Sequence, residues 1–367
     1  PYPIDIIPAS PTAQSLHHYG DVPVTLFNGL PNISIPLMEV GDRDLRLPIT
    51  LSYHASGINP EQHPGWVGLG WSLQAGGVIT RSQRGTTDEV VSDFGPDSLR
   101  YSYYTNFDVI DTAEWFSLES LQRFDTVDTG LAQPTPDEFR FTFMGYSGSF
   151  YLNHLGEWQV KSDQNIAIQV EVDEPAPISV FTIGKRVKAE SQVARALQRF
   201  ILTTENGTRY TFGGDTSNIE FTQRLGDDDP VYFSGVVATS WYLTRIETVD
   251  GRIITLEYEA GPWQAEQTVL FQLYERIIND NFNLAGSVSR QQNPYVNSAS
   301  LINPVYLKKI STPNAEVHFS RSETTELGYD FGQFLQNPLQ FLPLQIIDEG
   351  GSPSWYQLDS IRLVAKG

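Results

Sequence analysis

The sequence predicts an all-β fold made of twisted antiparallel hairpins, arranged as a sandwich or as a curling sheet. Three observations predict it. Apolar and polar residues alternate over short runs, which is the period of a half-buried strand. Asn-Gly, Asp-Gly and Pro-Asn pairs separate these runs, and such pairs form tight turns. Three hairpin-like segments also resemble one another, which indicates an internal repeat.

The first elements belong to an extended N-terminal arm, residues 1–21, and to a β module, residues 22–137. Within the module, two apolar runs flank "NGLPN" at 28–32, which predicts a hairpin. The following run, 43–57, alternates, and Pro48 within it predicts an edge position or a bulge. One face of that run carries the apolar side chains of Leu45, Leu47, Ile49, Leu51 and Tyr53.

A glycine- and tryptophan-rich connection follows, "HPGWVGLGWSLQAGGVITRSQRG" at 63–85. A dinucleotide-binding loop would need G-x-G-x-x-G between a strand and a helix, and a P-loop would need Lys-Ser/Thr; neither context is present. Glycines allow a close backbone approach, and tryptophans can cover the core over such a thin backbone. We therefore predict a structural corner formed by Gly65, Trp66, Gly68, Gly70, Trp71, Gly76 and Gly77.

Residues 86–138 are acidic and predict a solvated insertion with one short helix near Ala113–Arg123; a cation site is the alternative. From residue 138 to 367 the hairpin pattern becomes regular, with the repeats at 199–214, 242–259 and 306–322. Between the last two, the first half of 265–304 predicts a strand and the second half a polar loop. The final run, 356–367, matches the first strand of a hairpin, so we expect the native polypeptide to continue and to pair it.

Composition limits the classes of function. The net charge of −20 argues against nucleic-acid binding, because an acidic surface repels phosphates. The chain has no cysteine, which excludes disulfides and thiolate metal sites. No apolar run approaches the roughly 20 residues of a membrane helix. Because the chain begins with Pro1 and shows no signal peptide, we expect a secreted or cell-surface protein whose signal peptide has been removed.

Several blocks of sequence, taken in order, resemble the N-terminal region of Rhs/YD-repeat proteins of the Bacteroidetes type. The blocks are "PNISIPL", "LPITLSYHASGI", "GWVGLGWSLQAGGVITRSQRG", "FTFMGYSGSFYL", "TTENGTRYTFG" and "SWYLTRIETVDG". The resemblance covers the chain from about Tyr19 to its end, apart from the acidic insertion. Strict tyrosine–aspartate repeats are sparse, which is typical of a lead-in to the repeat shell.

The resemblance implies a large secreted or surface-associated protein. In this family, YD hairpins coil into a β-shell that can enclose a C-terminal effector, often a toxin. The implied partners are the remainder of the same polypeptide and a secretion carrier, with type IX secretion as the usual export route. We therefore expect a structural, non-catalytic segment that helps to form or seal the shell.

Catalytic and metal motifs are weak. The six histidines have no zinc-ligand spacing, and "GYSGS" at 145–149 resembles a nucleophile elbow only superficially, because it lies at a hairpin turn. Adjacent Asp227, Asp228 and Asp229 could hold calcium, although the EF-hand spacing is absent and a solvated loop is the simpler interpretation. We expect no enzyme, no catalytic residue and no cofactor other than that possible calcium.

Two other functions stay open at this stage. A cell-surface adhesin would bind glycans through exposed aromatic side chains, with Tyr101, Tyr103, Tyr104 and Trp115 as candidates. A hydrolase of surface polymers would need a cleft with two carboxylates about 5 Å or 6.5–9.5 Å apart, and no sequence pair marks one.

Overall fold

The computed structural model describes residues 31–42, 45–54, 64–84, 88, 103, 135–171, 178–181, 190–193, 199–225, 237–262, 264–278, 287–324 and 355–366. The predicted arm at 1–21, the predicted helix near Ala113–Arg123 and the first apolar run before Asn28 lie outside these residues. All pairings between the described strands are antiparallel, which confirms the predicted all-β class.

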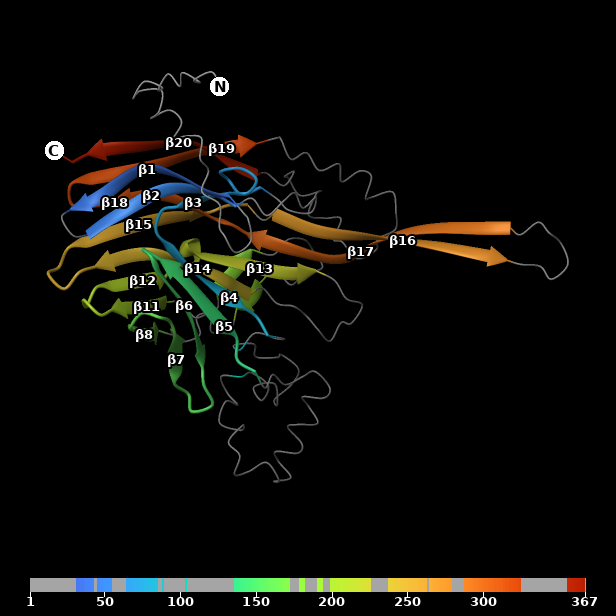
Figure 1. Ribbon diagram of the computed structural model, residues 1–367, viewed down its shortest axis with the longest axis horizontal. Coiled ribbons are helices and arrows are strands. Elements are labelled where there is room, and N and C mark those ends of the chain that lie inside the picture. Colours follow the sequence, from blue (N-terminus) through green and yellow to red (C-terminus); the bar gives the residue numbers. More distant parts are fainter. Residues whose placement is uncertain are drawn as a thin grey trace, which may run out of the picture.

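Fifteen strands form one network that divides into two sheets (Figure 1). Sheet I has the order β7 (Trp158–Lys161), β6 (Tyr146–Leu152), β5 (Glu138–Phe143), β4 (Gly77–Ser82), β14 (Val237–Glu247), β13 (Ile219–Leu225), β17 (Ser287–Asn303) and β16 (Gln264–Ile278). Sheet II has the order β8 (Ile166–Glu171), β11 (Arg199–Thr204), β12 (Arg209–Gly213), β14, β15 (Ile253–Ala260), β18 (Val305–Ser311), β19 (Ala315–Thr324) and β20 (Trp355–Ala365).

The long strand β14 belongs to both sheets. Its first part, up to Tyr242, pairs with β13 and β4 in sheet I. Its second part, from Leu243 to Glu247, pairs with β12 and β15 in sheet II. Two register shifts accompany this change, opposite Thr211/Phe212 of β12 and opposite Glu220/Phe221 of β13, and in both the extra residue belongs to β14. Such bulges bend strands, and they let one strand turn the corner between two packed sheets.

Aromatic rings fill the space between the two sheets. In β5, the side chains of Phe139, Phe141 and Phe143 are buried and alternate with exposed ones, as the sequence predicted. The Phe139 ring lies 5.4 Å from that of Phe200 in β11, and Phe200 lies 5.1 Å from Trp241 in β14. The interlocking rings bury large apolar surfaces and add favourable edge contacts, so they hold sheet I against sheet II.

Turn residues set the hairpins where the sequence placed them. Gly207 has φ 77° between β11 and β12, and Gly251 has φ 81° between β14 and β15. Such positive values suit glycine, which has no Cβ to clash. The Asn206 Oδ1 accepts a hydrogen bond from the Thr208 amide at 3.0 Å and so closes its turn. The third repeat turns at residues 312–314, between β18 and β19.

A separate three-stranded sheet contains β1 (Asn32–Asp42), β2 (Leu45–His54) and β3 (Trp71–Gln74). Leu45, Leu47 and Ile49 of β2 are buried and belong to the same hydrophobic cluster as the aromatic core. Pro48 pairs with Glu39 of β1 on one side only, because β3 begins its pairing at Thr50. Pro48 therefore occupies a local edge, one of the two positions that the sequence predicted.

Strands β16 and β17 correct one prediction. The segment predicted as a polar loop is strand β17, and it pairs with β16 along fifteen residue pairs from Gln264–Ile302 to Ile278–Ser287. The ladder satisfies backbone groups regardless of side-chain polarity, so polar residues did not prevent a strand. Figure 1 shows this ribbon projecting away from the body. The remaining described strands, β9 (Ile178–Phe181) and β10 (Glu190–Val193), form a two-stranded pair.

The packing predicts that two large-to-small substitutions change the free energy of unfolding by different amounts. Phe200→Ala removes a fully buried ring from the contact between the sheets, and we expect the free energy of unfolding to fall by about 3–5 kcal/mol. Leu155→Ala, at a turn residue that is 62% exposed, should change it by less than about 0.5 kcal/mol. Urea-induced unfolding of both variants measures the difference; equal losses would contradict the proposed core.

Candidate functional site

The predicted corner connects the three-stranded sheet to sheet I. The amide of Gly68 donates to the carbonyl of Gly65 at 3.0 Å, and the amide of Trp71 donates to the carbonyl of Gly68 at 3.2 Å. The carbonyl of Gly70 accepts a hydrogen bond from the His54 amide of β2 at 2.8 Å. The chain then forms β3, turns at Gly76 and enters β4 at Gly77. The corner is thus a hydrogen-bonded sequence of turns between two sheets.

The glycines at the end of the corner allow close packing. Gly76 has φ +134°, and a Cβ added there would lie 2.9 Å from the Leu256 side chain of β15. A Cβ on Gly77 would lie 2.3 Å from the Phe143 Cβ and 3.0 Å from the Thr142 carbonyl oxygen in β5. Such distances are too short for any side chain. The crossover therefore depends on bare backbone at these two positions.

The two tryptophans have different neighbours. The Trp66 ring lies 5.5 Å from Tyr306 of β18, and its carbonyl accepts a hydrogen bond from the Leu358 amide of β20 at 2.7 Å. The Trp71 ring lies 5.1 Å from Tyr53 of β2. Trp66 therefore connects the corner to the last strand of sheet II, whereas Trp71 stabilises the small sheet. Both side chains are half-buried.

A polar cluster lies near this corner, where β14 changes sheets. The Glu220 carboxylate of β13 accepts hydrogen bonds from the Ser240 hydroxyl at 3.2 Å and the Tyr242 hydroxyl at 3.3 Å. Burial, together with the nearby Glu220 charge, raises the pKa of Tyr242 well above its ordinary value. The Tyr242 and Tyr258 rings lie 5.3 Å apart, and the Tyr258 hydroxyl donates to the Leu243 carbonyl at 2.8 Å.

Sequence reasoning did not find this cluster, because its members come from three strands. Tyr242 and Tyr258 follow the alternating pattern of ordinary strand residues, and only the sheet register places Glu220 opposite Ser240. The hydrogen bonds satisfy buried polar groups and fix the bulged register. We interpret the cluster as structural, because among the described residues Glu220 is the single carboxylate that accepts hydrogen bonds from these hydroxyls.

A second buried cluster closes the base of the acidic insertion. The Asp137 amide donates to the Asp88 carboxylate at 2.9 Å, and the Asp88 amide donates back to Asp137 at 3.3 Å. The Asp137 carboxylate also lies 3.6 Å from the Arg81 Nε and accepts from the Arg84 amide at 2.8 Å. The Arg81 guanidinium lies over the Phe139 ring at 5.1 Å. We name this group the clasp; it joins residues 49 positions apart.

Burial dominates the electrostatics of the clasp. Asp88 and Asp137 are both fully buried. Desolvation raises the pKa of Asp137, although the Arg81 charge and the amide hydrogen bonds act in the opposite direction. The clasp therefore brings two buried carboxylates and one buried guanidinium together, and burial favours the protonated form of Asp137.

Among the aromatic and acidic candidates named from the sequence, Tyr103 lies within the described residues. Tyr103 is 2% exposed, and its hydroxyl donates to the Leu152 carbonyl at 3.1 Å, so it cannot belong to an exposed aromatic row. The remaining candidates lie outside the described residues: Tyr101, Tyr104, Trp115, Asp227, Asp228 and Asp229. The described residues contain no group of three or more acidic or histidine side chains that could hold a metal ion. They also contain no helix long and apolar enough to cross a bilayer.

Comparisons with known proteins identify structural likeness but no family. No protein-family model matches the sequence, and no curated protein matches it significantly. A structure of the Photorhabdus luminescens Tc holotoxin pore aligns with 82% of this chain and 11% of its own chain, at 13% identity and a TM-score of 0.33. The crystal structure of TcdB2-TccC3-TEV aligns with 91% of this chain and 12% of its own, at 12% identity and a TM-score of 0.29.

A third structure matches over nearly its full length. The N-terminal domain of the effector protein SpvB from Salmonella typhimurium strain LT2 aligns over 91% of this chain and 99% of its own, at 14% identity and a TM-score of 0.26. All three structures come from toxin or effector proteins. The chain spans only about a ninth of the two Tc chains.

The corner predicts a sharp contrast between two glycines. Gly77→Ala places a methyl group against Phe143. We expect the free energy of unfolding to fall by about 1–3 kcal/mol, as it does when a core is overpacked. Gly65→Ala meets only the Trp71 carbonyl at 3.9 Å and should cost less than about 0.5 kcal/mol. Chemical denaturation of both variants tests this; a tolerated Gly77→Ala would overturn the close-approach argument.

The clasp predicts a pH dependence. Because the pKa of Asp137 is raised on folding, the folded state binds more protons, so the free energy of unfolding should rise as the pH falls from about 7 towards about 4. Asp137→Asn should remove the contribution of this carboxyl and so reduce the slope, whatever its effect on absolute stability. Asp163→Asn, at an exposed turn, should keep it. Denaturation at several pH values measures the slope, and an unchanged slope in Asp137→Asn would contradict the assignment.

Proposed function

We propose that this chain is a non-catalytic structural segment of a large secreted Rhs/YD-repeat-type protein. It would start or seal a β-shell that encloses a C-terminal toxin or other effector. The sequence blocks that resemble that family support the proposal, and so does the all-β architecture of hairpins on a common sheet. Export and the absence of catalysis are parts of the proposal.

One observation carries the proposal: sheet II grows in the order of the sequence. After β14, the strands β15, β18, β19 and β20 follow one another across the sheet. The β16–β17 ribbon interrupts this order and belongs to sheet I. Sequential addition of hairpins to one sheet is how a repeat protein builds a continuous wall, because each repeat buries its apolar face against its neighbour.

The outer edge of β20 is the place where such a wall would continue. Within the described residues, β20 pairs with β19 along 355–365 and has no second strand beside it. Among the described residues, Leu358 is the one member of β20 whose amide donates outside the β19–β20 ladder, to the Trp66 carbonyl. Beyond it, Asp359, Ser360 and Arg362 are exposed, and so is Leu363 at 52%. A bare strand edge is a template for another strand.

The acidic composition supports the same function. A wall that carries a net charge of −20 stays soluble and repels nucleic acid. Its main partner would be the remainder of its own polypeptide, which would supply the strand beside β20. A secretion carrier would be a second partner.

Hydrogen exchange of β20 tests the proposed function. In the isolated chain, amides of residues 359–365 that face away from β19 should exchange rapidly. In the native polypeptide purified from its source, the same amides should exchange at least tenfold more slowly, because a neighbouring strand would protect them. Residues 309–311 of β18, an interior strand, serve as the control and should exchange equally in both samples. Equal exchange of β20 in both samples would contradict the proposal.

A further inference from the structure

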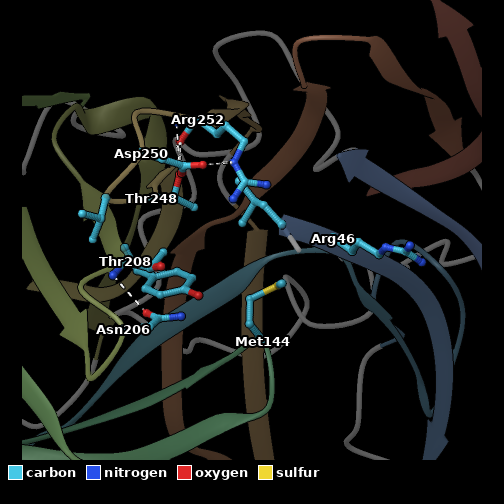
Figure 2. Close-up of a pocket in the computed structure, with 10 residues that line it drawn as sticks. Arg46, Met144, Asn206, Thr208, Thr248, Asp250 and Arg252 are labelled. Carbon is cyan, nitrogen blue, oxygen red and sulfur yellow. Dashed lines mark hydrogen bonds and ion pairs between the residues drawn. The ribbon is translucent and has the colours of Figure 1, made fainter. Parts of the chain in front are cut away.

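An open cavity lies where the turns of several hairpins meet. It has a volume of about 400 Å³ and is lined by ten residues. Figure 2 shows Thr248, Asp250 and Arg252 on one side, Asn206 and Thr208 on another, and Met144 across from them. The proposed shell function uses none of these side chains. Cavities of about 300–1,000 Å³ are typical of small-molecule sites.

Tyr210 supplies the first sign of a ligand. Its side chain is 5% exposed and packs 4.6 Å from the Phe143 ring, yet its hydroxyl has no hydrogen-bond partner among the described residues. Burial raises the pKa of Tyr210 to about 12, so the hydroxyl keeps its proton at neutral pH. The hydroxyl oxygen is not enclosed by protein atoms, so it faces the cavity as a donor that no protein acceptor uses. Because Tyr210 lines the cavity, a bound ligand can supply the acceptor.

Two neighbours add further donors. Asn206 uses its Oδ1 twice, accepting from the Thr204 hydroxyl at 2.7 Å and the Thr208 amide at 3.0 Å, which leaves its NH₂ group without a described partner. The Thr208 side chain is 4% exposed, and its hydroxyl also has no partner among the described residues. Tyr210, Asn206 and Thr208 lie along one strand end, so their donors can act on one ligand.

Arg252 and Asp250 decide the charge of that ligand. The Arg252 Nε donates to Asp250 at 2.8 Å and its Nη1 donates to the Asp42 carbonyl at 3.2 Å, which leaves Nη2 without a described partner. The Thr248 hydroxyl lowers the pKa of Asp250, so this carboxylate is ionised at neutral pH. An anionic ligand would meet Asp250, and a cationic one would meet Arg252. A neutral ligand that both donates and accepts hydrogen bonds fits the pair.

Apolar side chains complete the cavity. Leu45 and Met144 line it together with Val249, which is 76% exposed. Met144 has φ 46° and is the single non-glycine residue with positive φ in the described part of the chain. Met144 and Gly145, which has φ 81°, form the two-residue turn between β5 and β6, and hairpin turns of this kind need positive φ at both positions. The turn places Met144 as an apolar wall opposite the hydrogen-bonding groups.

We propose that this cavity binds a neutral saccharide of one or two rings. Sugar hydroxyls both donate and accept, so they can satisfy Tyr210, Asn206 and Arg252 while donating to Asp250. The C–H face of a ring can pack on Met144 and Val249. The site does not involve the exposed aromatic side chains that the sequence suggested for glycan binding. It would allow the folded segment to bind to glycans on a surface.

Calorimetric titration of the full chain with a panel of neutral sugars tests the proposal. The panel contains glucose, galactose, mannose, N-acetylglucosamine, maltose, cellobiose and lactose. We expect millimolar or tighter binding of at least one member. Tyr210→Phe should weaken sugar binding roughly tenfold, which corresponds to one hydrogen bond. The thermal stability of this variant should stay equal or rise, because the Tyr210 hydroxyl that it removes has no hydrogen-bond partner in the described part of the protein. Arg252→Lys should also weaken binding.

A matched control separates the site from general damage. Tyr53→Phe changes a tyrosine that stacks on Trp71, away from the cavity residues, and should leave the affinity unchanged. Three results would each overturn the proposal: no binding by any sugar of the panel, binding that survives both Tyr210→Phe and Arg252→Lys, or binding of glucuronate in preference to glucose. None of these results bears on the proposed shell function, because hydrogen exchange at β20 measures a different surface.

Discussion

The passage of β14 from sheet I to sheet II is the constraint on which the rest of the structure depends. One strand cannot pair in two sheets unless both sheets meet at it, so the aromatic residues of β5 and β11 are brought face to face. Trp241 lies at this joint, fully buried beside Phe200. The bulges within β14 provide the bend. The burial of the aromatic side chains and the pairing of β14 with both sheets thus stabilise the structure at the same place.

The corner extends this arrangement to the third sheet. Its bare backbone at Gly76 and Gly77 lets the chain pass between β15 and β5, where no side chain would fit. Its other end reaches β20, because the Trp66 carbonyl accepts the Leu358 amide. In this geometry the glycine- and tryptophan-rich stretch is a hydrogen-bonded corner between two sheets. It joins the first strands of the chain to the edge at which the proposed wall would grow.

Local chemistry decided what the sequence could predict. Asn206–Gly207 and Asp250–Gly251 encode their turns within a few residues, and the alternation of β5 encodes its buried face, so these features followed from the pattern alone. Long-range features did not follow. The sharing of β14 depends on pairing with strands far away in the chain, and the clasp joins Asp88 to Asp137 across an insertion. The cavity needs turns from separate hairpins, and β17 was missed because its residues lack apolar alternation.

The most direct test of the central claim is a strand-resolving cryo-microscopy structure of the native polypeptide, purified from its source and weighed intact. Our account predicts a mass well above 41.1 kDa and a further strand hydrogen-bonded along residues 359–365 of β20, from which the wall continues. A native polypeptide near 41.1 kDa, with the outer edge of β20 still bare, would contradict it.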